Sequence, residues 1–249
     1  MQTTTLDVLA PQAPATATPA PRVPMFTSIH KGIRACMMDA LHLVGRTDAD
    51  DPAAVAAAVA AVRSLVALCQ VHLHGENQFI HPAMEARRPG SSTGTADEHV
   101  AHEQAFEALL SDTQCVERSS GAARTTALAV LYQRLSLFVA DNFEHMFEEE
   151  THNQSVLWEA YTDAELLAVE GQIIASHTPE QTMLGLRWML PAMTPAERVA
   201  LFGNARAGMP PEVFAGFLDF AASVLGERDG ATLRAAFCSG ERERQGWPA

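Results

Sequence analysis

The chain has 249 residues, of which 47% are apolar, enough to bury a substantial core in one large or two small domains. It carries 30 acidic and 17 basic residues, a formal net charge of −13, and no basic patch, so we expect no nucleic-acid partner. Aromatic residues make up only 6% of a chain rich in alanine, which favours helices over strands.

The ends of the chain and its cysteines suggest where the protein resides. Residues 1–24 are rich in Pro, Ala and Thr and lack a basic start and a long apolar run, which predicts a disordered tail rather than a signal peptide. The Ala/Val run after Asp51 is cut at Arg63, short of the roughly 20 residues that a membrane span needs. We therefore expect a cytoplasmic protein without a membrane partner. Its widely spaced cysteines are expected to be reduced and buried: Cys36, Cys69, Cys115 and Cys238.

Residues 25–160 are predicted to form four long helices. Their apolar residues recur at spacings of three and four, which is typical of helices with one buried face. Proline suits the first position of a helix, and Thr followed three residues later by Glu is a capping box. The predicted helices cover 27–44, 52–79 with Asp51 as its cap, a third from the capping box Thr95/Glu98 through Leu110, and 123–158.

Residues 161–240 are predicted to form a smaller helical region, followed by a tail over 241–249. Capping signals at Thr162, Thr178 and Thr194 begin three helices, Pro210-Pro211 opens a fourth, and a last short helix ends near Phe237. This region has no metal-like or catalytic cluster, and the pattern gives it no role beyond a surface through which copies of the chain could associate.

The chemistry of the chain lies in its histidines, eight of which fall between His30 and His145. Three of these that we take as candidate ligands have a glutamate four residues later, and a histidine and a carboxylate at that spacing share one face of a helix. The pairs are His72 with Glu76, His99 with Glu103, and His145 with Glu149, and His30 stands without such a partner.

An up-down-up-down bundle of the four helices brings these residues to one level. The start of the first and third helices and the end of the second and fourth helices then meet at the same end of the bundle. Counting 100° per residue places His72 and His145 on the buried stripes, His74 and His81 on the outer face, and His152 facing inward.

Glu76 and Glu149 lie on stripes that are otherwise apolar and offer no neighbouring Lys or Arg. Buried carboxylates cost several kcal/mol unless they are paired or bound to a metal. A mixed set of imidazoles and carboxylates suits iron or manganese better than copper(I) or structural zinc. The sequence therefore predicts two metal ions inside the bundle.

The chain resembles the hemerythrin-like (HHE cation-binding) family over about residues 25–160. The resemblance rests on His30 in Ser-Ile-His-Lys, His72-Leu-His-Gly-Glu76, Glu98-His99, and His145-Met-Phe-Glu-Glu149. It implies a four-helix bundle with a non-haem diiron centre, in which His30, His72, His99 and His145 are imidazole ligands and Glu76 and Glu149 bridge the irons.

One position departs from the oxygen-carrying members, which have a second histidine four residues after the first on the third helix. Here Glu103 occupies that position, with His102 one residue earlier, and either could be a further ligand. An added carboxylate favours oxidised iron, so we expect binding of O₂, NO or peroxide in sensing or stress response rather than simple oxygen carriage.

Two alternatives remain at this stage. The first is a diiron oxidase, oxygenase or peroxidase, which requires a substrate-sized cavity between the bundle and the C-terminal helices. The second is an iron sensor or iron donor, whose folding would depend on the metal.

Overall fold

The computed structural model describes residues 22–244, with side chains described up to residue 237. The outer parts of the two predicted tails, 1–21 and 245–249, lie outside the described residues. Within residues 22–244 every regular element is a helix, so the predicted all-α class is confirmed.

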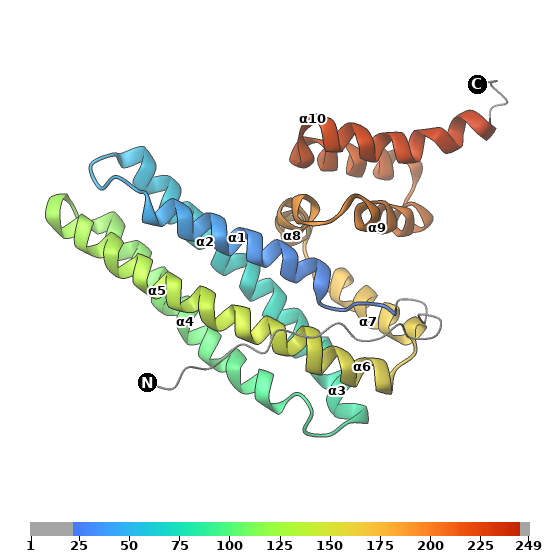
Figure 1. Cartoon of the computed structure of the whole chain (residues 1–249), viewed down its shortest axis with the longest axis horizontal. Helices are drawn as coiled ribbons and strands as arrows, with labels where there is room; N and C mark the ends of the chain where they lie inside the picture. The colour runs from blue at the N-terminus through green and yellow to red at the C-terminus, as the bar shows by residue number, and fades with distance from the viewer. Residues whose placement is uncertain (1–21, 245–249) are drawn as a thin grey trace, which may run out of the picture.

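Four long helices form the bundle shown in Figure 1, and each packs against two of the others. Helix α2 lies against α1 and α4, and α5 lies against the same two helices from the other side. The four are α1 (Thr27–Gly45), α2 (Pro52–Gly75), α4 (Thr93–Arg118) and α5 (Gly121–Glu148).

The starts of α2 and α4 show how local chemistry sets helix boundaries. The Asp51 side chain accepts hydrogen bonds from the backbone amides of Ala53 and Ala54, which confirms the predicted cap. The prediction for α4 was wrong, because the helix already begins at Thr93. The hydroxyl of Thr95 donates to the carbonyl of Ser92, so it is not a cap, and Glu98 is free to bond elsewhere.

Helices α2 and α5 are each prolonged by a single π-helical turn, η1 (Glu76–Ile80) and η2 (Glu149–Asn153). After these turns the chain continues as α3 (His81–Arg87) and α6 (Gln154–Ala160). A π turn inserts one extra residue, which rotates everything after it by about 100° relative to a regular helix. Both insertions begin at the glutamate of a predicted His–Glu pair.

The bundle core is apolar along most of its length, with Leu65, Leu109, Leu131 and Leu135 fully buried. The helical run Pro52–Arg87 is long and apolar enough to cross a membrane by length and composition, although the sequence led us to expect no such run. Within its apolar window 44% of the residues are buried, and those on the inner face, such as Val62, Leu65 and Cys69, line the core of the bundle.

The C-terminal region contains α7 (Asp163–Ser176), α8 (Pro179–Ala192), α9 (Pro195–Gly208) and α10 (Pro211–Arg244), which bends at Gly226. The three capping boxes before α7, α8 and α9 are confirmed. Helix α8 packs along α1, and the two backbones approach so closely at Gly32 that a Cβ there would lie 2.9 Å from the amide nitrogen of Met189. The other face of α8 joins a second apolar cluster with α9 and α10 (Figure 1).

The cysteines agree with the sequence only in part. Cys36 and Cys69 are buried free thiols, and burial raises the pKa of Cys36 to about 12. Cys115 is free but exposed, so the expectation of a buried residue was wrong there. The side chain of Cys238 lies outside the described residues.

Candidate metal centre

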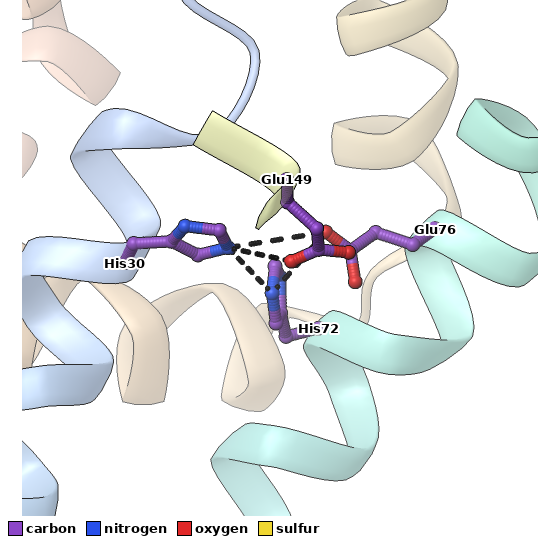
Figure 2. Close-up of side chains that lie close together, drawn as sticks. All are labelled: His30, His72, Glu76 and Glu149. Atoms are coloured by element: carbon purple, nitrogen blue, oxygen red, sulfur yellow. Dashed lines mark hydrogen bonds and ion pairs between the residues drawn. The ribbon is translucent and has the colours of Figure 1, made fainter. Parts of the chain in front are cut away.

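Six of the predicted site residues meet at one end of the bundle, where α1 and α4 begin and α2 and α5 end. Their side chains form two overlapping groups whose candidate ligand atoms lie within 4.8 Å of one another. The first group is His30, His72, Glu76 and Glu149, and the second is Glu76, His99, His145 and Glu149. Figure 2 shows the first group, with His30 and Glu149 on separate segments, His72 and Glu76 on one continuous helical run, and the four side chains pointing toward one another.

The histidines form two pairs through their Nε2 atoms. His30 Nε2 lies 3.1 Å from His72 Nε2, and His99 Nε2 lies 3.1 Å from His145 Nε2. His30, His99 and Glu149 are at most 2% exposed, so water does not screen these groups.

Each glutamate directs one oxygen toward each pair. Glu76 Oε1 is 3.3 Å from His72 Nε2, and its Oε2 is 3.5 Å from His99 Nε2. Glu149 Oε2 is 3.3 Å from His30 Nε2, and its Oε1 is 3.3 Å from His145 Nε2. The carboxylates thus span the space between the pairs, as bridging ligands of two ions would.

The outer nitrogens of three rings are held by hydrogen bonds. His30 Nδ1 donates to Glu150 at 3.0 Å, His99 Nδ1 to Asn77 at 2.7 Å, and His145 Nδ1 to Glu98 at 2.6 Å. In a neutral ring this leaves the lone pair on Nε2, which is the arrangement that metal-bound histidines show. None of these three partners was predicted from the sequence. Their only signal was position, since Glu98 precedes His99, Glu150 follows Glu149, and Asn77 follows Glu76.

The electrostatics of the cluster favour a positive charge between the two histidine pairs. All four carboxylate oxygens of Glu76 and Glu149 are buried without a hydrogen bond of good geometry. Burial and the nearby Glu149 carboxylate raise the pKa of Glu76 well above its usual value. Burial acts in the same direction on Glu149, but the surrounding imidazoles outweigh it and hold the pKa of that carboxyl well below its usual value. These donors therefore fit two divalent cations, which would satisfy oxygens that have no other partner.

Glu103 is the predicted site residue that the structure leaves out, because its side chain is exposed. The buried stripe of α4 follows steps of three and four through His99, His102, Phe106 and Leu109. Glu103 lies outside that stripe, beyond the edge farther from His102. His102 is the third-helix residue that lies beside the cluster, with its ring 4.7 Å from that of His145.

The π turns overturn two further expectations. His81 was expected on the outer face, but η1 turns it inward, where its ring stacks on His99 at 4.8 Å. Burial, followed by the neighbouring His99 imidazole, lowers the pKa of His81 to about 4. His152 was expected to face inward, but η2 turns it outward and buries Asn153 in its place. His74 is exposed, as predicted.

Two hollows border the centre. A small, partly open cavity of about 10 Å³ touches His72, Glu76, His99 and His145 inside the bundle. An open hollow of about 1000 Å³ lies on the surface beside α4, α5 and α6, and Glu98 lines it. Glu98 therefore connects the outer nitrogen of His145 to solvent.

Comparison with known proteins agrees with this geometry. The model of the hemerythrin HHE cation binding domain family matches residues 23–155, which contain all six converging residues. No match was found among curated proteins.

Proposed function

The chain belongs to the hemerythrin HHE cation-binding family, and on that premise we propose that it holds two non-haem iron ions and binds O₂, NO or peroxide in sensing or stress response. The observation that carries this proposal is the pair of glutamates, each with one oxygen toward His30 and His72 and the other toward His99 and His145. The alternation of helix starts and ends at one level supports the up-down-up-down order that we infer for the bundle.

Bound iron would supply an open coordination position and the capacity to exchange electrons with a small ligand. The chain's own residues perform the other tasks. Glu150, Asn77 and Glu98 hold three imidazoles in one tautomer and orientation. The apolar core next to the cluster restricts the access of water.

The position of Glu103 changes the weight of the functional alternatives. The expectation against reversible oxygen binding relied on an added carboxylate, and Glu103 does not reach the cluster. The small cavity of about 10 Å³ admits at most a molecule about the size of water, which favours a small ligand over a bulky substrate.

Metal analysis of three variants tests the proposal. Wild-type protein is expected to hold about two irons, and His72→Ala and Glu149→Ala to hold far less, because each removes a proposed ligand. His74→Ala is the matched control, since His74 lies two residues from His72 but is exposed. Unchanged iron in both ligand variants would reject the centre, and a large loss in His74→Ala would show that the helix faces are misassigned.

A further inference from the structure

A single layer of side chains separates the metal centre from the apolar core. One helical turn from each histidine of the centre, toward the middle of the bundle, lie Ile33, Cys69, His102 and Asn142. These four residues help to enclose the cavity of about 10 Å³ that also touches the centre. A space of this size is at the lower limit for one molecule the size of water.

The layer is polar on one side. Ile33 and Cys69 come from α1 and α2, whereas His102 and Asn142 come from α4 and α5. The polar side is therefore the one that carries His99 and His145. A small ligand in the cavity meets hydrogen-bonding groups beside that pair and apolar groups beside the other pair.

His102 lacks the partners that buried polar groups usually have. Its side chain is 7% exposed, and no hydrogen bond joins either ring nitrogen to a residue between 22 and 237, although neither nitrogen is among the fully buried polar atoms without a partner. Its ring instead lies edge-on to His145, at 86° between the ring planes. Asn142 differs, because its amide nitrogen already donates to the carbonyl of Phe138 at 2.9 Å. A ring that lines a cavity and has no partner among these residues can donate its N–H to a molecule held in the cavity.

His102 is not one of the clustered ligands. Neither group of candidate ligand atoms includes it, although the neighbouring His99 and His145 belong to the second group. Its ring is close to the centre without belonging to it, which is the place of a residue that contacts what the centre binds.

We propose that His102 is a ligand-positioning residue, whose ring N–H donates a hydrogen bond to a small acceptor molecule held in the cavity beside His99 and His145. This inference rests on the proposed function, because the cavity binds such a ligand only when the centre is loaded. The chemistry fits a diatomic molecule with an acceptor atom and disfavours one that fills the cavity with apolar atoms.

Nitric oxide binding to the reduced, iron-loaded protein tests the inference. His102→Leu should keep the wild-type iron content and bind NO about tenfold more weakly, because one hydrogen bond is lost. His102→Gln keeps a donor and should recover most of the affinity. Glu103→Gln, on the adjacent exposed position of α4, is the matched control and should match wild type. Affinity is read from absorbance during NO titration, and iron from elemental analysis of the same samples.

The outcomes separate this inference from the proposed function. Equal NO affinity in His102→Leu and wild type would overturn the role of His102 while leaving the iron centre intact. Loss of about half the iron in His102→Leu would overturn it in another way, by making His102 a ligand. Wild-type protein that holds no iron would overturn the proposed function, and the inference with it.

Discussion

The two ends of the bundle fill its interior with opposite kinds of side chain. At the end where α2 and α5 begin, Val55, Val59 and Leu128 close the core with apolar contacts. At the other end, four histidines and two glutamates occupy equivalent inward positions. Hydrophobic burial stabilises the first end by itself, whereas the second buries groups whose desolvation needs compensation.

The largest test of this difference is removal of the metal. Chelation of iron from the loaded protein should lower the free energy of unfolding by about 4 kcal/mol for each ion that had been present at a thousand times its dissociation constant. Hydrogen exchange should accelerate around His145 and Glu149 while the amides near Leu131 keep their protection. Equal acceleration at both ends would show that the bundle behaves as one unit and that the contrast between its ends has no energetic meaning.

A core truncation at the apolar end should also lower the free energy of unfolding, but this loss should not depend on bound metal. Leu131 is fully buried, and Leu131→Ala should cost about 3 kcal/mol through lost contacts and a residual cavity. Iron content per folded chain should not change. Leu137→Ala, on the same helix at an exposed position, is the control and should cost less than about 0.5 kcal/mol. Loss of iron in Leu131→Ala would contradict the independence of the two ends. Denaturant unfolding with iron analysis measures both quantities.

The smallest expected effect concerns the outer partner of His145. Glu98→Ala removes the acceptor of the His145 Nδ1–H and should weaken iron binding about tenfold, with little change in the fold because Glu98 is half exposed. Glu98→Gln keeps an acceptor oxygen and should weaken binding less. Glu107→Ala, an exposed glutamate on the same helix, should bind iron like wild type. Competition with a chelator of known affinity ranks the iron affinities of the three variants. Equal iron affinity in all three would show that Glu98 does not support the metal centre.

The sequence predicted the helices better than the environment of single residues. Apolar spacing and caps such as Asp51 and Thr162 are local, so most helix boundaries followed from a few neighbouring residues. Thr95 with Glu98 was misread as a cap, because a capping box and a carboxylate reaching another helix have the same local pattern.

The predicted facing directions of side chains were wrong wherever a π turn changed the helical period. A count of 100° per residue places His72 and His145 correctly but misplaces His81 and His152, because each of these follows a π turn that begins at a glutamate of the centre. Nothing in the local sequence marked the inserted residue. The error at Glu103 has a different cause, since the buried stripe of α4 steps to His102 and leaves Glu103 outside.

The order and spacing of His30, His72, Glu76, His99, His145 and Glu149 determined by themselves that these side chains share one level, because helix geometry fixes where each residue stands along its axis. The tertiary structure decided which oxygen of each glutamate approaches which histidine pair, and which outer groups hold the rings. It also decided that His102, and not Glu103, lies beside the cavity. These outcomes depend on the rotation of each helix against its neighbours and on the π turns, and both are set by packing among distant segments rather than by adjacent residues.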